Sequence, residues 1–253
     1  MTIHKTISGS GTDVVVIHGW SCDSRYMEPV VTELTKKYRV TNIDLPGCGK
    51  SLWDESIKNI HDIADLIKPY LPQNAIFVPW SFGGLVTISL ASRYPEYVNR
   101  IVGFGTTPKF IADKNWLGVP QPGFKASFNA EIEKVGYKKF FQSFIDNEFN
   151  LKIKPKEYYK VSELLQNGND PDNAVLFSGV NICDASDLRS EFSKLNCEID
   201  LIWGEKDQSV LLDSRLAVKS LNNNVNLHVI PDAQHMMFWT HFEDVKQVLK
   251  NIL

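Results

Sequence analysis

The sequence contains no uninterrupted apolar run approaching the ~18 residues that a membrane-spanning helix needs. Its first five residues, Met1-Thr2-Ile3-His4-Lys5, lack the apolar core of a signal peptide. None of the four cysteines belongs to a C-x-x-C pair, which argues against a zinc knuckle and a thioredoxin-type site. We therefore expect a cytoplasmic protein with no membrane span and with free thiols at Cys22, Cys48, Cys183 and Cys197.

An excess of charge of one sign is also missing. The 27 Lys and Arg residues stand against 30 Asp and Glu residues, and the resulting net charge of -3 gives no reason to expect nucleic acid as a partner. What is present is an ordinary globular composition, with 43% hydrophobic and 23% charged residues. A chain of 253 residues with this composition can form one α/β unit.

Short apolar runs alternate with helical patterns along most of the chain. The runs are continuous and often β-branched, which is typical of strands buried on both faces of a parallel sheet. They cover residues 14–17, 40–43, 75–78, 101–105, 199–203 and 227–230, and helical patterns lie between them, for example at 60–71 and 85–93. The alternation predicts an α/β fold with a mostly parallel, doubly wound sheet.

The alternation stops between residues 108 and 195, where no convincing buried strand occurs. Helix-like patterns at 124–135, 137–148 and 156–165 occupy this stretch. We therefore predict a core made of residues 1–107 and 196–253, with residues 108–195 inserted between two of its strands as a helical lid.

Ser81 lies where a predicted strand passes into a helix, in Trp80-Ser81-Phe82-Gly83-Gly84. A sharp turn there would hold the hydroxyl out above the sheet edge, as in the G-x-S-x-G motif of serine hydrolases. Pro79 replaces the first glycine of that motif, and proline lacks an N–H but can be the last residue of a strand. We predict that Ser81 is a nucleophile, the alternative being that it only caps the helix.

A serine hydroxyl needs a base to remove its proton, and the base needs an acid to orient it. Asp207 follows the run at 199–203, and His235 follows the run at 227–230. Both loops leave the carboxyl ends of strands, where open α/β sheets place their sites. The order Ser81, Asp207, His235 is the one found in hydrolases with the G-x-S-x-G motif, so we predict His235 as base and Asp207 as acid.

Three residues compete for these two roles. Glu205 and Asp232 lie in or near the same loops, and either replaces Asp207 if the loop lengths differ. His241 is the rival base, but it falls inside a C-terminal helical pattern, which is more typical of a surface or capping residue.

The oxyanion formed during ester cleavage requires two preorganised N–H donors. The backbone N–H of Phe82, directly after the nucleophile, is one candidate. The other is expected in His18-Gly19-Trp20, after the first strong strand, where Trp20 is the best candidate and His18 is interpreted as a structural residue.

One segment is similar to the end of a phosphate-binding loop, namely Gly47-Cys48-Gly49-Lys50-Ser51. The full pattern requires a glycine five residues before Gly49, and that position holds Asp44. We therefore interpret the segment as a turn of the scaffold and not as a nucleotide site.

Taken together, four motifs resemble the α/β-hydrolase family across the whole chain. They are His18-Gly19-Trp20, Asp44-Leu45-Pro46-Gly47-x-Gly49-x-Ser51, Trp80-Ser81-x-Gly83-Gly84, and Gly204-x-x-Asp207 with His235. Within this family the chain looks most like the carboxylesterases that hydrolyse the methyl ester of pimeloyl-acyl carrier protein in biotin synthesis. Trp20, Trp80 and the run at 106–110 followed by Trp116-x-Gly118 carry this likeness, which weakens beyond Gly123.

The resemblance implies ester hydrolysis by Ser81, His235 and Asp207 with no metal or organic cofactor. It also implies that the substrate contacts Trp20, Trp80, Phe82, Phe140, Phe141, Phe144 and His235. The three phenylalanines belong to the predicted lid, and ordinary packing within the lid is the alternative interpretation.

The resemblance further implies acyl carrier protein as the partner. Between residues 134 and 160 the chain has seven lysines against three acidic residues, a local net charge of +4. Acyl carrier proteins are strongly acidic, so a basic patch would steer them to the lid. We predict Lys138 and Lys139 as carrier contacts, the alternative being a solvated helix face.

Two other functions remain open. A general short-chain carboxylesterase or lipase would share every triad residue and differ only in the lid. A non-catalytic binding protein can keep the triad and use only the pocket. A haloalkane dehalogenase is disfavoured because its nucleophile is an aspartate, and the corresponding residue here is Ser81.

Overall fold

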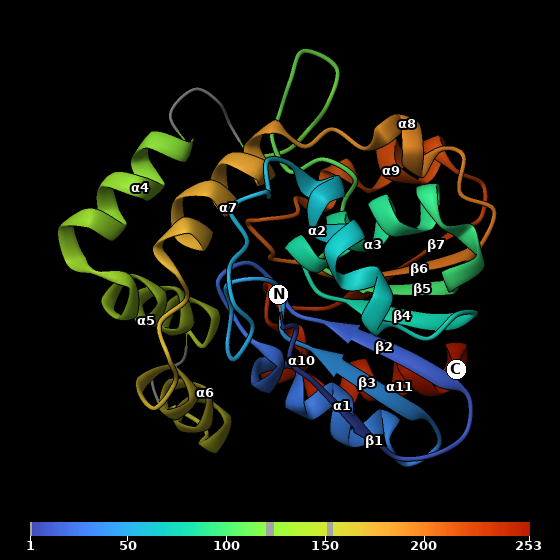
Figure 1. The fold of residues 1–253 in the computed structure, drawn as a ribbon, viewed down its shortest axis with the longest axis horizontal. Coiled ribbons are helices and arrows are strands. Elements are labelled where there is room, and N and C mark those ends of the chain that lie inside the picture. Colours follow the sequence, from blue (N-terminus) through green and yellow to red (C-terminus); the bar gives the residue numbers. More distant parts are fainter. Residues whose placement is uncertain (1, 120–123, 151–153) are drawn as a thin grey trace.

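The computed structural model describes residues 2–119, 124–150 and 154–253. Its centre is a seven-stranded sheet in the order β1-β3-β2-β4-β5-β6-β7 (Figure 1). The strands are β1 (Lys5–Ser8), β2 (Asp13–Ile17), β3 (Arg39–Ile43), β4 (Ala75–Pro79), β5 (Val98–Phe104), β6 (Glu198–Gly204) and β7 (Val225–Ile230). Only the pairing of β1 with β3 is antiparallel within this sheet. The predicted parallel, doubly wound sheet is confirmed.

All six apolar runs identified in the sequence are strands, but β1 was missed. Its residues, Lys-Thr-Ile-Ser, are half-buried or exposed and contain no apolar run. The strand forms by adding to the outer edge of β3, with Lys5 opposite Ile43 and Ser8 opposite Val40. Its position depends on a partner strand and not on its own hydrophobicity.

Helices cover both faces of the sheet, and α4, α5 and α6 gather on one side of it (Figure 1). The helices are α1 (Glu28–Leu34), α2 (Ile60–Ile67), α3 (Phe82–Arg93), α4 (Phe124–Val135), α5 (Tyr137–Glu148), α6 (Lys156–Gln166), α7 (Asn173–Ala185), α8 (Arg189–Phe192), α9 (Arg215–Leu221), α10 (Met237–Thr240) and α11 (Phe242–Ile252). No helix in the described part of the chain has the length and apolar character required to cross a membrane.

The three helical patterns predicted between β5 and β6 are α4, α5 and α6, whereas α7 was not predicted. Asp172 caps α7 by accepting a hydrogen bond from the Ala174 N–H at 2.8 Å. Gly179 weakens the helical signal in the middle of α7. A Cβ at that position would lie 2.8 Å from Nε1 of Trp20, so the glycine makes room for an indole from a distant loop.

The side chains of β2 divide between two buried cores. Val14 and Val16 belong to the same hydrophobic cluster as the buried residues of α1 and α11, whereas Val15 and Ile17 pack with those of α2 and α3. The period of two expected of a strand therefore supplies both faces of the sheet. The first of these clusters continues into α4, α5, α6 and α7, which attaches the helical insertion to the core.

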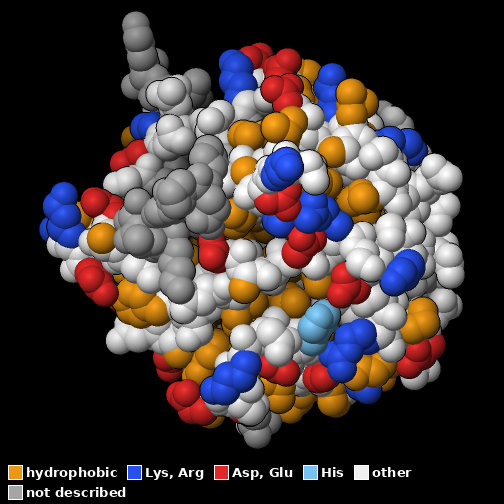
Figure 2. All heavy atoms as spheres, turned by 90° about the horizontal axis from the view of Figure 1, so that it is seen from above, with side chains coloured by type: hydrophobic (Ala, Val, Ile, Leu, Met, Phe, Trp, Pro, Cys, Tyr) orange, Lys and Arg blue, Asp and Glu red, His pale blue; other side chains and the backbone are white. Residues whose placement is uncertain are grey.

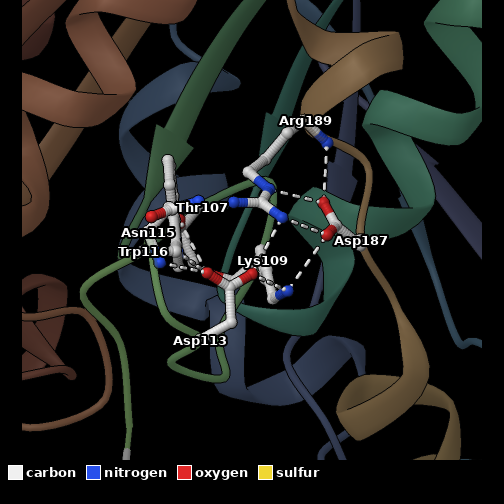
Figure 3. A network of polar contacts seen from close by, with 7 residues as sticks. All are labelled: Thr107, Lys109, Asp113, Asn115, Trp116, Asp187 and Arg189. Atoms are coloured by element: carbon white, nitrogen blue, oxygen red, sulfur yellow. Dashed lines mark hydrogen bonds and ion pairs between the residues drawn. The ribbon is translucent and has the colours of Figure 1, made fainter.

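A network of charged side chains joins the two ends of the insertion (Figure 3). Lys109 Nζ, after β5, lies 2.6 Å from Asp113 Oδ2 and 3.0 Å from Asp187 Oδ2. Arg189 Nη2, at the start of α8, lies 2.6 Å from Asp187 Oδ2 and 2.9 Å from Asp113 Oδ2. A network of several ion pairs stabilises a structure more than isolated surface pairs do, so these contacts hold the two ends of the insertion together.

Candidate active site

Ser81 stands at the corner between β4 and α3, with φ 53° and ψ -118°. A residue other than glycine in this region costs about 1–3 kcal/mol and persists only where its surroundings enforce it. Here the Ser81 N–H donates to Phe104 O at 2.9 Å, and two glycines follow. A Cβ on Gly83 would lie 2.7 Å from His18 O, and one on Gly84 would lie 2.2 Å from the Thr106 side chain. The glycines therefore permit the close packing that holds the corner.

The capping interpretation of Ser81 does not hold. Its side chain makes no capping hydrogen bond to α3, although this part of the chain is fully described. The hydroxyl instead borders a cavity. A strained backbone with an uncommitted hydroxyl is what a strand-to-helix nucleophile requires.

Pro79 fits as the last residue of β4, opposite Ile17 of β2. The next two backbone N–H groups are used, since Trp80 donates to Ile17 O at 2.8 Å and Ser81 donates to Phe104 O at 2.9 Å. The proline therefore removes one donor without displacing the corner that follows it.

His235 and Asp207 form a buried pair beside this corner. His235 Nδ1 lies 2.7 Å from Asp207 Oδ2, and the two residues are 4% and 2% exposed. Asp207 Oδ1 accepts hydrogen bonds from the backbone N–H groups of Ser209 at 2.7 Å and Val210 at 3.0 Å. With Nδ1 facing a carboxylate, the neutral imidazole carries its proton there, and Nε2 is left as the basic nitrogen.

Two further contacts fix the position of the His235 ring. Trp80 Nε1 donates to the His235 carbonyl oxygen at 3.1 Å. Gly105, with φ 49°, leaves no room for another side chain, because a Cβ there would lie 2.7 Å from His235 Cε1. The Trp80 bond therefore holds the backbone of His235, and the close approach of Gly105 restricts its ring.

The pKa of His235 is raised above its usual value. Burial by itself lowers it, but the negative charge of Asp207 and its hydrogen bond to the ring outweigh this effect, and Glu148 adds to them. A buried imidazolium beside two carboxyl groups is thus stabilised when the ring takes a proton.

The structure distinguishes the competing residues from this pair. Asp232 is exposed and lies 2.5 Å from Lys206 Nζ, while Glu205 Oε2 accepts a hydrogen bond from the Asp232 N–H at 3.0 Å. His241 is the N-cap of α11, and its Nδ1 lies 2.9 Å from Thr240 Oγ1. Asp207 is the candidate acid that reaches His235.

The two expected oxyanion donors border the same cavity as Ser81. Within the described residues, neither the Trp20 N–H nor the Phe82 N–H donates to another group of the protein. Phe82 is the first residue of α3, where N–H groups have no intrahelical acceptor and carry partial positive charge. The arrangement suits stabilisation of an oxyanion, and the role of both residues stays a prediction.

His18 is structural, as predicted. The buried ring accepts a hydrogen bond from the Leu45 N–H at Nε2, 2.9 Å away, so Nδ1 carries the proton and donates to Gly19 O at 2.7 Å.

The segment that resembles a phosphate-binding loop binds a carboxylate of the protein itself. The Lys50 N–H donates to Asp44 Oδ2 at 2.9 Å, which places a carboxylate where a phosphate would have to bind.

A cavity of about 300 Å³ opens at Ser81 and His235. All seven residues that the resemblance implied as substrate contacts line it: Trp20, Trp80, Phe82, Phe140, Phe141, Phe144 and His235. The Phe144 ring centroid lies 6.5 Å from that of His235, and that of Phe140 lies 6.5 Å from that of Trp20. The three phenylalanines of α5 therefore line the same cavity as Ser81 and His235, while their contact with substrate stays a prediction.

The sequence analysis missed several other lining residues. Phe110, Val119, Phe128, Val180 and Cys183 come from between β5 and β6, and Gln208 comes from the loop after β6. Their local patterns match those of ordinary core residues, so no sequence signal separates them from the core. They reach the cavity only because α4, α7 and two loops come together beside Ser81 in the folded chain.

The lysines of the insertion are largely engaged in local contacts. Lys138 Nζ donates to Gln166 O at 3.0 Å and lies 3.5 Å from Asp170 Oδ1, and Lys160 Nζ lies 2.8 Å from Glu28 Oε2. Lys139 is exposed and has no ion pair within the described residues, whereas Lys152 lies outside them. Figure 2 shows basic and acidic side chains interspersed on one face and no field of a single sign.

Residues 13–242 match the sequence model of a protein family whose description is "alpha/beta hydrolase fold". The chain belongs to the α/β-hydrolase family. It is 30% identical over 249 residues to a pimeloyl-[acyl-carrier protein] methyl ester esterase of Shewanella woodyi, covering 96% of this chain and 94% of that protein. An enzyme of the same name from Vibrio cholerae is 27% identical over 239 residues, covering 94% of this chain and 89% of that one. The chain is a carboxylic ester hydrolase of this family.

Solved structures show the same fold. A bromoperoxidase from Bacillus anthracis superposes on this α/β-hydrolase with a TM-score of 0.86 at 21% identity, covering 98% of this chain and 93% of that one. An esterase from Exiguobacterium antarcticum gives a TM-score of 0.85 at 21% identity, covering 99% and 94%. At this identity the likeness concerns the fold alone.

Proposed function

We propose that this esterase hydrolyses the methyl ester of pimeloyl-acyl carrier protein, a step of biotin synthesis, with Ser81, His235 and Asp207 as its triad. The observation that carries the proposal is the apolar cavity bordered by both Ser81 and His235, the latter paired with the buried carboxylate of Asp207. The names of the relatives from Shewanella woodyi and Vibrio cholerae support the choice of substrate.

The reaction proceeds in two halves. Ser81 Oγ attacks the ester carbonyl carbon while His235 Nε2 takes the hydroxyl proton, and the N–H groups of Trp20 and Phe82 stabilise the oxyanion. Collapse breaks the bond to the methoxy oxygen, which leaves as methanol with the proton from His235. Water then loses a proton to His235 and attacks the carbonyl carbon of the acyl-enzyme. The bond from this carbon to Ser81 Oγ breaks as His235 returns the proton to Oγ, and the released acid ionises to the free carboxylate.

The lining of the cavity suits this substrate. Phe140, Phe141 and Phe144 of α5 and Trp20 offer apolar surface to the methylene chain between the ester and the carrier. The neutral ester loses little by leaving water, whereas the carboxylate product is poorly solvated among these rings. Product is therefore expelled after hydrolysis.

The proposal is tested by comparing two substrates with the purified protein. We expect kcat/KM on pimeloyl-acyl carrier protein methyl ester to exceed that on a free p-nitrophenyl ester of similar acyl length. Equal values would favour a general short-chain esterase. If neither ester is cleaved and a fluorophosphonate does not label Ser81, the protein uses the fold for binding alone.

Charge reversal of Lys138 and Lys139 is expected to raise KM for the carrier-bound ester about 10-fold, because an acidic carrier would meet like charge at α5. The KM for a free p-nitrophenyl ester should stay unchanged, since that substrate makes no use of the helix surface. Reversal of Lys37 and Lys250, which are exposed elsewhere, is the control with the same change in net charge. Equal losses on both substrates would reject the carrier contact.

A further inference from the structure

Helix α5 carries three features along its length. Lys138 and Lys139 lie in its first turn, Phe140, Phe141 and Phe144 line the cavity, and the buried carboxyl group of Glu148 ends it. Glu148 is 7% exposed and takes no part in the mechanism above. A carboxylate at the end of a helix also meets unfavourable partial negative charge. The stability of α5 therefore does not explain why a glutamate is buried at this position.

Glu148 contacts the loop that carries His235. The Met236 N–H donates to Glu148 Oε2 at 2.6 Å, directly after the predicted base in the chain. The neighbouring residue makes a second connection, since Gln234 Nε2 donates to Asn147 O at 2.6 Å and Asn147 Nδ2 donates to Gln234 Oε1 at 3.3 Å. The end of α5 therefore holds the loop on both sides of His235. These four residues, Asn147, Glu148, Gln234 and Met236, are termed the α5 clasp.

We propose that Glu148 is a positioning residue, which holds the His235 loop through the Met236 N–H and sets the charge around the base from the lid side. This inference rests on the proposed role of His235 and extends it to the helix expected to meet the carrier. A substrate or carrier that binds along α5 would thereby influence the position of His235, because the same helix contacts both.

The electrostatics agree with this geometry. Burial raises the pKa of Glu148 to about 7, while the charge of His235 and the hydrogen bond from Met236 oppose the rise and Asp207 adds to it. His235 and Asp207, each in a loop after a strand, are the ionisable groups with the largest effect on Glu148. Lys154, beyond the end of α5, binds the carbonyl oxygens of Asp146 and Phe149. The charge of each of these two groups, Glu148 and His235, therefore favours the charged form of the other.

Two substitutions separate the hydrogen bond from the charge. E148Q keeps an oxygen that accepts from the Met236 N–H but removes the negative charge. Ionised Glu148 raises the pKa of His235, so its replacement should move the acid limb of kcat/KM on p-nitrophenyl acetate to lower pH. The shift should be at most about 1 unit, because Glu148 is itself partly protonated below pH 7, and kcat on the plateau should be nearly unchanged. E148A also leaves the Met236 N–H without its partner, and kcat should fall about 10- to 100-fold because the base loses its position.

The matched control is Asp146→Asn on the same helix. Asp146 is exposed, its Oδ1 accepts from the Tyr158 hydroxyl at 2.7 Å, and its charge is screened by solvent. We expect this variant to keep the acid limb of the parent protein. Gln234→Ala, which removes the other half of the α5 clasp, should lower kcat without moving the limb.

Titration of the His235 ring by NMR measures the same shift without any substrate. If the parent cleaves no ester, the proposed function fails while this titration still tests Glu148. An E148Q variant whose His235 titrates as in the parent would overturn the inference. Equal losses of kcat in E148Q and E148A with an unmoved acid limb would also overturn it, because Glu148 would then serve only the fold.

Discussion

Replacing Ser81 with alanine is expected to lower kcat roughly 10⁵–10⁶-fold, because the reaction loses the atom that attacks the ester. The residual rate would come from the oxyanion donors and substrate binding alone. Stability should not fall, since the Ser81 hydroxyl makes no capping bond and alanine keeps the Cβ. Ester hydrolysis at substrate saturation and labelling by a fluorophosphonate measure the effect.

Ser92→Ala is the matched control for this substitution. Ser92 lies on the same helix α3, and its hydroxyl donates to Ser89 O at 3.0 Å, far along the helix from the corner. It should retain full activity and full labelling. A Ser81→Ala protein that still forms a covalent fluorophosphonate adduct at the normal rate would refute the assignment of the nucleophile.

The Asp207→Asn variant should lose about 10⁴-fold in kcat near neutral pH. An amide that keeps the Ser209 and Val210 hydrogen bonds through its oxygen presents its NH₂ group to His235 Nδ1. Nδ1 must then accept, so the ring proton moves to Nε2 and the base faces Ser81 in the wrong tautomer. Removal of the carboxylate charge also lowers the pKa of His235, because that charge is the main effect raising it.

The pH profile of kcat/KM checks both effects of Asp207→Asn. The activity loss appears on the plateau, and the acid limb moves to lower pH than in the parent. Asp232→Asn serves as the control, since Asp232 is exposed and pairs with Lys206. Were Asp232→Asn the variant that loses activity, the acid would have been assigned to the wrong loop.

The sequence by itself predicts that the three candidate triad residues lie at one edge of the sheet. Each apolar run is long enough to specify a buried strand, and parallel strands bring their carboxyl ends to one edge of the sheet. Ser81, Asp207 and His235 directly follow three such runs, so short-range pattern and a general rule of topology bring them to that edge. Helices α4, α5 and α6 were likewise predictable, because their periodicity is local.

Other features depend on partners far away in the chain. β1 exists because β3 offers an unpaired edge, and α7 tolerates Gly179 because the Trp20 indole needs the space. The choice of Asp207 over Glu205 depends on loop geometry that brings one carboxylate to 2.7 Å from His235. No spacing rule distinguishes acids that lie within two residues of each other.

The cavity and the α5 clasp were decided only by the tertiary structure. The sequence pattern of Val180 and Cys183 is that of core residues of a helix, and only the folded chain brings them to the cavity at Ser81. Glu148 has the pattern of a solvated acid, and only the packing of α5 against the loop after β7 buries it. Sequence patterns record which residues prefer burial and where strands end. They do not record which buried surfaces meet, because that depends on packing between elements far apart in the chain, such as those of Glu148 and Met236, which are 88 residues apart.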